Sequence, residues 1–178
     1  MASRRDLESL FHDGIQFSME KLGFPNRELR LEQYDAIRSI VLDRKDVLAV
    51  LPTGFGKSLI YQVLPAILDF IQCGCEPTKE ESVIIVVSPL NALMRDQVEK
   101  LQQKLNVCML QSAVDDESQN VNIPKTLQQS SLVFGHPEVF IDDRNVTKIL
   151  RCKQFQRRVQ AIVVDEAHLV HQWYLYFL

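Results

Sequence analysis

The sequence predicts an α/β fold built on a parallel β-sheet, and three observations indicate it. Apolar runs with strand character alternate with segments of helical periodicity along most of the chain. One run, residues 82–87, is rich in β-branched residues without polar alternation, which is typical of a strand buried on both faces of a parallel sheet. A glycine-containing loop at residues 51–58 joins a predicted strand to a predicted helix.

The N-terminal part of the chain is predicted to be helical. Apolar side chains recur at helical spacing over residues 6–22 and again over residues 31–42. A break at residues 23–26 separates the two helices, because Gly23 and Pro25 interrupt the helical pattern. A polar turn then leads into a strand at residues 47–50, and the helix after the glycine loop extends to about residue 71.

The rest of the chain continues the alternation. Strands are predicted by the apolar runs at 82–87, 107–110, 131–135 and 159–164. Helices are predicted at 90–105 and 146–155, and the polar segment 111–122 is expected to be a surface loop or a weak helix. Strands that alternate with helices in this way are joined by right-handed crossovers in a parallel sheet.

Composition limits the functions that the chain can have. Its 178 residues are about one domain long, and the formal net charge of −3 provides no general attraction for nucleic acid, so any such contact must come from a local basic patch. The four cysteines lack the paired spacing of zinc ligands, so we expect no zinc site and expect the four thiols to be reduced. No apolar run approaches the ~18 residues of a membrane span, so we expect a soluble cytosolic or nuclear protein without a membrane partner.

The glycine loop has the residue types that bind a polyphosphate. Gly54 and Gly56 allow the backbone to turn its N–H groups inward, and the following helix adds the positive end of its dipole. Lys57 can reach the β- and γ-phosphates, and the Ser58 hydroxyl can bind Mg²⁺. The sequence has Leu51 where the usual pattern has a first glycine. The predicted nucleotide-binding residues of the loop are Pro52, Thr53, Gly54, Phe55, Gly56, Lys57 and Ser58.

A pair of carboxylates follows the last predicted strand. Asp165 and Glu166 come directly after residues 159–164, and ligands of open parallel sheets bind at the carboxyl ends of the strands. Asp165 can hold Mg²⁺ through water, and Glu166 can orient and deprotonate an attacking water molecule. The alternative for an isolated acidic pair is a solvated loop.

These motifs resemble those of a known superfamily. The glycine loop resembles motif I of the superfamily 2 DEAH-box helicases, which do not require the first glycine, and Asp165-Glu166-Ala167-His168 resembles motif II. The chain is more similar to the RecQ-like family. Residues 29–33 resemble its motif 0, residues 86–98 its motif Ia, residues 137–138 the end of motif Ib, and residues 171–173 the start of its aromatic-rich loop.

The resemblance implies an N-terminal RecA-like lobe of a P-loop NTPase, with ATP and Mg²⁺ as cofactors and DNA, single-stranded or partly duplex, as partner. Arg30 and Gln33 would recognise the adenine, although without the register of the other motifs Gln33 would be more typical of a helix surface. The catalytic residues would be Lys57, Asp165, Glu166 and His168. His168 would couple the ATP state to DNA contacts, or would form a structural hydrogen bond. Trp173 would stack on a DNA base or pack in the core. The residues that the resemblance places near DNA are Ser88, Pro89, Arg95, Gln97 and Trp173.

The resemblance also predicts an incomplete lobe. We expect an N-terminal helical segment at 1–24 and a helicase ATP-binding domain at 25–178 that stops after motif II. The strand of motif III, expected between the strands of motifs I and II, and the second lobe with its arginine finger would be absent. Apolar surface would then be exposed at two strand edges, and ATP hydrolysis by this chain alone would be weak or absent.

The function expected is therefore that of an ATP-binding lobe of a 3′–5′ DNA helicase of DNA repair and recombination, for which the resemblance favours the nucleus. Two alternatives stay open. One is a truncated form that binds ATP or nucleic acid without turnover, and the other is a lobe of an RNA helicase of the same superfamily.

Overall fold

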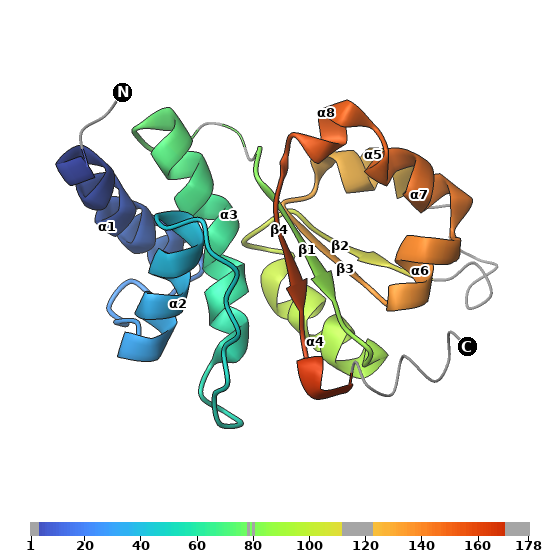
Figure 1. Cartoon of the computed structure of the whole chain (residues 1–178), viewed down its shortest axis with the longest axis horizontal. Helices are drawn as coiled ribbons and strands as arrows, with labels where there is room; N and C mark the ends of the chain where they lie inside the picture. Colours follow the sequence, from blue (N-terminus) through green and yellow to red (C-terminus); the bar gives the residue numbers. More distant parts are fainter. Residues whose placement is uncertain (1–3, 78, 80, 112–122, 170–178) are drawn as a thin grey trace. The chain divides into compact units, whose positions relative to one another are not determined.

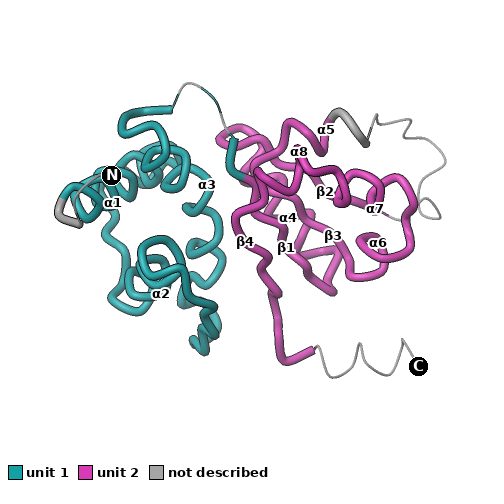
Figure 2. Tube along the Cα trace, turned by 45° about the horizontal axis from the view of Figure 1, so that its top comes forward, with its two compact units in different colours: residues 1–82 teal, residues 83–178 magenta. Residues whose placement is uncertain are grey.

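The computed structural model describes residues 4–77, 79, 81–111 and 123–169, and the chain divides into two compact units, residues 1–82 and 83–178 (Figure 2). The first unit contains the glycine loop, and the second contains the β-sheet. None of the described helices is both long and apolar enough to cross a membrane.

Three helices form the first unit: α1 (Arg4–Lys21), α2 (Leu31–Val41) and α3 (Lys57–Cys73) (Figure 1). Both α1 and α2 pack against α3, which begins at the glycine loop. Phe11 and Ile37 are fully buried, as is Ile67 of α3. The Ser18 hydroxyl of α1 also donates a hydrogen bond to the Val63 carbonyl of α3, at 3.1 Å. Helix α3 is thereby held by two supporting helices.

Residues 47–50 do not form the predicted strand. They have no regular secondary structure, and Leu48 and Val50 are 81% and 84% exposed. A strand is stabilised by hydrogen bonds and side-chain contacts with a neighbouring strand. Within the described chain no strand pairs with this run. The strand prediction is therefore wrong here, whereas the loop and the helix after it are as predicted.

The second unit is built on a four-stranded sheet, which confirms the predicted fold class. Its strands are β1 (Val83–Val87), β2 (Val107–Leu110), β3 (Leu132–Gly135) and β4 (Val159–Val164), in the order β2-β3-β1-β4. All three pairings are parallel. The central strand β1 is buried on both faces, as its β-branched sequence predicts.

The helices of the second unit are α4 (Asn91–Leu101), α5 (Ile123–Gln129), α6 (Pro137–Asp142), α7 (Arg144–Leu150) and α8 (Lys153–Gln156), with a short 3₁₀ turn at Ala167–Leu169. The single helix predicted at 146–155 is thus two helices with a break at Cys152. In a continuous helix Val146 and Phe155 would lie on opposite faces, about 180° apart at 100° per residue. The break allows both side chains to be buried.

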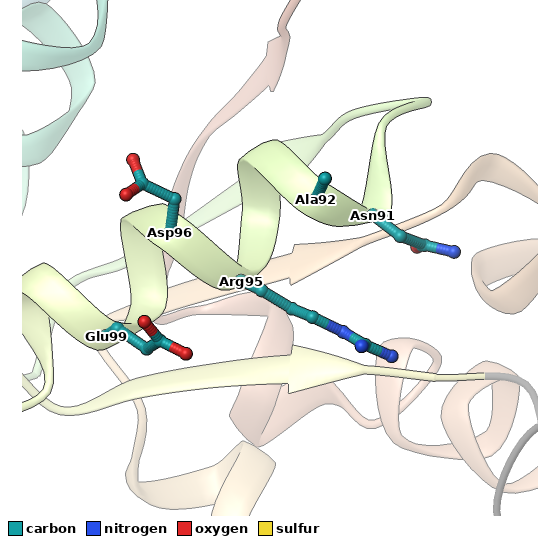
Figure 3. A pocket seen from close by; sticks show the side chains of 5 residues that line it. All are labelled: Asn91, Ala92, Arg95, Asp96 and Glu99. Atoms are coloured by element: carbon teal, nitrogen blue, oxygen red, sulfur yellow. The ribbon is translucent and has the colours of Figure 1, made fainter.

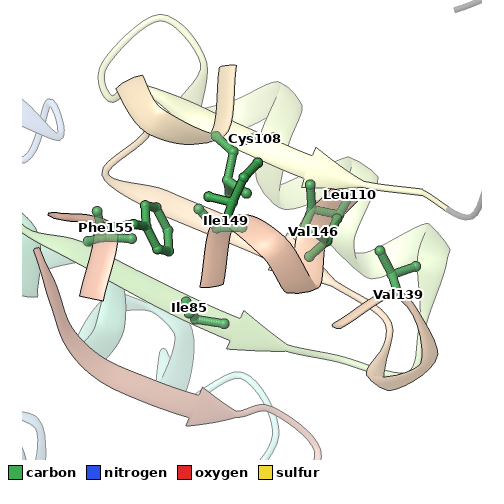
Figure 4. Close-up of a cluster of buried hydrophobic side chains, with 10 residues drawn as sticks. Ile85, Cys108, Leu110, Val139, Val146, Ile149 and Phe155 are labelled. Atoms are coloured by element: carbon green, nitrogen blue, oxygen red, sulfur yellow. The ribbon is translucent and has the colours of Figure 1, made fainter. Parts of the chain in front are cut away.

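The core of the second unit lies between the sheet and the layer formed by α5, α6, α7 and α8 (Figure 4). Ile85 of β1 and Val133 of β3 belong to the same cluster of buried side chains as Ile149 and Phe155 of these helices. At the edge of the sheet, β4 is less covered, since Ile162 and Val164 are 67% and 44% exposed. Exposed apolar side chains are therefore present near both of the predicted strand edges, residues 47–50 and 159–164.

Candidate nucleotide and nucleic-acid site

The glycine loop has the backbone geometry of an anion cradle. Gly54 and Gly56 have φ angles of 76° and 91°, a left-handed conformation that other residues rarely adopt. Gly56 is the N-cap of α3 and no side chain caps this helix, so its first N–H groups face the loop rather than a capping side chain. Lys57 donates a 3.2 Å hydrogen bond to the Leu51 carbonyl across the loop. This arrangement fits a bound polyphosphate.

Gln33 holds the glycine loop from α2. Its amide nitrogen donates to the carbonyls of Phe55, at 3.2 Å, and Gly56, at 3.0 Å. Its amide oxygen accepts a hydrogen bond from the Arg30 backbone N–H at 2.9 Å. The side chain is 1% exposed, so Gln33 is not the surface residue of the alternative interpretation. All of its polar atoms are used within the first unit.

Arg30 contacts the loop through an aromatic side chain. Its guanidinium lies 4.3 Å from the centroid of the Phe55 ring, in a cation–π arrangement. Sequence reasoning placed Arg30 at the adenine and Phe55 in the loop, but it did not predict that the two residues touch. The sequence did contain a hint of this contact, because Phe55 is a large aromatic residue between two glycines in a loop.

The acidic motif lies at the carboxyl end of β4. The Asp165 N–H donates to the Val87 carbonyl at the end of β1, and the Asp165 carboxylate accepts a 3.1 Å hydrogen bond from the Glu166 N–H. Glu166 has a φ of 52°, an uncommon conformation for a residue with a side chain and one that functional sites often contain. His168 is largely exposed, and its Nδ1 lies 3.2 Å from a carboxylate oxygen of Glu166.

The loop after β1 contains two of the residues predicted to contact DNA. Ser88 is 1% exposed, and its hydroxyl has no hydrogen-bond partner among the described residues. Pro89 is half-buried, and its carbonyl lies 2.6 Å from Nε2 of His136. His136 follows β3 and also contacts the Glu138 carboxylate through Nδ1. Sequence reasoning did not identify this histidine, which joins the segments that resemble motifs Ia and Ib.

The other two described residues of this set are on α4. Arg95 is exposed and lines a pocket on this helix together with Asn91, Ala92, Asp96 and Glu99 (Figure 3). Gln97 is half-buried. The pocket mixes one guanidinium with two carboxylates, so it has no strong positive character. Trp173 lies outside the described residues.

Apart from Arg95 and Gln97 on α4 and from Trp173, the predicted site residues fall into two groups. Arg30, Gln33 and the loop 52–58 form one connected cluster in the first unit. Residues 88–89 and the acidic motif come at the carboxyl ends of the adjacent strands β1 and β4 in the second unit.

Comparison with known proteins agrees with the motifs. The family model described as DEAD/DEAH box helicase matches residues 30–177, which is most of the chain. The chain belongs to the DEAD/DEAH box helicase family. Sequence relatives within this family support the more specific resemblance. The chain is 40% identical over 135 residues to the ATP-dependent DNA helicase RecQ of Synechocystis sp.. It is 33% identical over 167 residues to the ATP-dependent DNA helicase hus2/rqh1 of Schizosaccharomyces pombe. The predicted similarity to RecQ helicases is confirmed.

A solved helicase structure has a similar fold. The DUF1998 helicase MrfA, crystallised with DNA and AMPPNP, superimposes with a TM-score of 0.62 over 88% of this chain, at 19% sequence identity. The chain of this DEAD/DEAH box helicase spans only part of these proteins. The match with the Synechocystis helicase covers 75% of this chain and 25% of that protein, and the match with hus2/rqh1 covers 88% of this chain and 12% of that protein. The superposition covers 21% of the MrfA chain.

Proposed function

We propose that this chain is the ATP-binding lobe of a RecQ-like, ATP-dependent DNA helicase. In the longer protein that the relatives represent, ATP hydrolysis would drive 3′–5′ unwinding of DNA in the nucleus or cytoplasm. The observation that carries the proposal is the glycine loop, whose two left-handed glycines precede an uncapped 17-residue helix that begins with Lys57. A side chain at Gly56 would place its Cβ 2.7 Å from the Gln33 amide nitrogen, so Gln33 would have to move and its hydrogen bonds to the loop would be disturbed.

The residues of the chain have the chemistry that Mg²⁺ and ATP require. Bound Mg²⁺ supplies charge neutralisation for the phosphates. Ser58 at the start of α3 and Asp165 at the end of β4 offer the hydroxyl and carboxylate oxygens that this hard cation prefers. Lys57 would exchange its hydrogen bond with the Leu51 carbonyl for phosphate oxygens. Glu166 would take the proton of the attacking water, and His168 would hold the Glu166 carboxylate.

Adenine recognition is proposed for Arg30 and Gln33. The Gln33 amide is already bound to the loop carbonyls, so a base edge would have to share or replace these hydrogen bonds. We propose that Gln33 thereby couples the base to the conformation of the phosphate loop. The guanidinium of Arg30 has one face on Phe55, which leaves its other face for stacking on a base.

The first experiment measures nucleotide binding by the 178-residue chain with a fluorescent ATP analogue and Mg²⁺, together with a thermal melt. We expect binding, an upward shift of the melt with nucleotide, and loss of both in Lys57→Ala. Lys45→Ala is the matched control, because Lys45 is an exposed lysine outside the loop. Equal affinity of the wild-type chain and Lys57→Ala would reject the proposed site.

The second experiment measures ATP turnover with and without single-stranded DNA or RNA. In other nucleotide hydrolases an arginine finger supplied from outside the ATP-binding domain raises turnover by orders of magnitude, so we expect the 178-residue chain by itself to show weak turnover that DNA stimulates. Glu166→Gln should retain nucleotide binding and lose turnover. Stimulation by RNA alone would favour an RNA helicase of the same family, and binding without any turnover would favour a non-catalytic form.

A further inference from the structure

The segment from Arg144 to Arg158 has a charge unlike that of the rest of the chain. It contains six basic residues and no acidic residue. Removing these six positive charges from the formal net charge of −3 leaves −9 for the remaining residues. The sequence alone required a local basic patch for any nucleic-acid contact, and this segment has the composition of one.

The fold places five of these side chains on one surface, here called the basic stripe: Arg144, Lys148, Arg151, Lys153 and Arg157. All five are exposed. Arg144 and Lys148 of α7 and its C-cap residue Arg151 lie within about 60° of each other around the helix axis, at 100° per residue. Val146 and Ile149 are buried on the opposite side. Lys153 of α8 and its C-cap residue Arg157 likewise lie on the side of this helix opposite the buried Phe155.

Among the described residues, no carboxylate neutralises the charges of the basic stripe. Within the described part of the chain, none of the five side chains forms an ion pair. Arg158 is different, because its guanidinium donates to the carbonyls of Gln128 and Ser130. The Asp143 carboxylate, next to Arg144, accepts hydrogen bonds from the Asn145 and Val146 N–H groups as the cap of α7. Like charges at i, i+4 destabilise a helix, so the stripe carries a small cost to folding that a bound anion would offset.

The stripe lies on a different face from the residues predicted to contact DNA. The β1-to-β2 connection contains α4 and runs toward one edge of the sheet, whereas the β3-to-β4 connection contains α7 and α8 and runs toward the other edge. Right-handed crossovers in opposite directions put their helices on opposite faces, and Figure 1 shows α7 and α8 in one layer away from α4. Arg95 and Gln97 on α4 therefore belong to another surface.

We propose that the basic stripe on α7 and α8 is a second, sequence-independent contact for the phosphate backbone of nucleic acid. From Arg144 to Arg151 the helix rises about 10 Å, close to the axial length over which one strand of a duplex carries three phosphates, at about 3.4 Å of axial rise each. The choice of nucleic acid over an acidic protein rests on the proposed helicase function. The stripe would hold nucleic acid to the lobe independently of the nucleotide state.

The test compares the affinity of the full chain for a fluorescent oligothymidine at several salt concentrations, without nucleotide. The stripe variant is Arg144→Gln/Lys148→Gln/Arg151→Gln. Loss of three phosphate contacts should weaken binding roughly tenfold at low salt and reduce the slope of log K against log salt by about 2. The control Arg44→Gln/Lys45→Gln/Lys79→Gln removes the same charge from exposed basic residues elsewhere and should leave the slope unchanged. Arg144→Lys/Arg151→Lys keeps the charge and should bind as the wild type does.

Several outcomes would overturn this proposal. One is an unchanged slope in the stripe variant, and another is an equal loss in the stripe variant and the control variant. A third outcome is that the stripe variant loses binding of polyglutamate but not of oligothymidine. This result would assign the surface to an acidic protein. A thermal melt checks that the stripe variant folds. Nucleotide binding measured on the same variant separates this proposal from the proposed function, since it should be unchanged if only the stripe is affected.

Discussion

At the scale of single residues, the two glycines of the phosphate loop have the same backbone conformation but different surroundings. A Cβ at Gly54 would meet no atom within 4 Å, whereas one at Gly56 would lie 2.7 Å from the Gln33 amide nitrogen. Both positions carry the strain of a left-handed residue, which costs about 1–2 kcal/mol for a residue other than glycine. At Gly56 the substitution also displaces the side chain that holds the loop.

We therefore predict that Gly56→Ala impairs the loop more than Gly54→Ala. Gly54→Ala should weaken binding of the ATP analogue by the backbone strain alone, and Gly56→Ala should weaken it further and lower the melting temperature as well. Titration of the fluorescent analogue and a thermal melt of both variants measure this. Indistinguishable variants would show that Gln33 does not brace the loop.

His136 is the second residue whose role depends on its contacts. Its two ring nitrogens face two acceptors, the Glu138 carboxylate and the Pro89 carbonyl. Both nitrogens must carry a proton for both hydrogen bonds to form. Burial would raise the pKa of the Glu138 carboxyl, but the hydrogen bond from His136, a hydrogen bond with the backbone and the histidine charge outweigh it and hold that pKa below its usual range.

A lowered pKa in the folded chain means that Glu138 contributes stability above its unfolded pKa, about 4.3, and that this contribution is lost as the pH falls through the lower folded value. Glu138→Gln should therefore reduce the melting temperature at pH 6, with a smaller difference from the wild type at pH 3. Glu99→Gln, a substitution of an exposed carboxylate on α4, is the control. If the difference in melting temperature were the same at both pH values, the interaction between His136 and Glu138 would not stabilise the chain as proposed.

At the scale of elements, the break between α7 and α8 shows how the core decides helix ends. Helical periodicity alone predicted one helix through residues 146–155. The structure has two short helices, because Cys152 is extended with φ of −70° and ψ of 121° and so resets the helix direction. The buried positions of Val146, Ile149 and Phe155 require this change of direction. The same break separates the part of the basic stripe on α7 from the part on α8.

The cap of α7 provides a test at this scale. The Asp143 carboxylate accepts hydrogen bonds from the Asn145 N–H at 2.8 Å and the Val146 N–H at 3.1 Å. Asp143→Ala should reduce the free energy of unfolding by about 1 kcal/mol, the usual value for an N-cap. Urea denaturation measures it, with Asp142→Ala as the matched control because Asp142 is an exposed residue at the end of α6. An equal effect of both substitutions would show that the cap is unimportant.

At the scale of the whole molecule, the four cysteines differ in solvent exposure, so their reactivity can be used to measure how well the folded chain protects its core. Cys73, Cys75 and Cys152 are exposed, and Cys108 is buried in the core of the second unit. Burial raises the pKa of the Cys108 thiol to about 11, although a hydrogen bond with Ser130 opposes the change. This thiol therefore stays protonated and unreactive at neutral pH.

We predict that a thiol reagent at pH 8 labels three cysteines of the native chain rapidly and the fourth only when the chain unfolds. Mass spectrometry of the labelled chain counts the modified residues, and Cys108→Ala should remove the slow phase. The rate of the slow phase should increase with urea in parallel with unfolding. Rapid labelling of all four thiols would mean that the second unit does not hold its core in solution.

Much of the fold and part of the site followed from local sequence patterns. The β-branched run of β1 and the loop with Gly54, Gly56 and Lys57 were recognised because periodicity and spacing depend only on neighbouring residues. Helices α5 and α6 were not predicted, since both are short and their apolar pattern covers fewer than two full turns. The roles of Phe55 and His136 were not predicted either, because each depends on a partner distant in the chain.

The sequence by itself determined the parallel α/β class, the positions of the strands β1 to β4 and the two motifs that assign the family, because these are properties of short segments. Only the tertiary structure decided the sheet order, the buried bracing of the loop by Gln33 and the basic stripe. It also decided that residues 47–50 form no strand, since a strand requires a partner. These features depend on contacts between segments far apart in the chain, which no local pattern encodes.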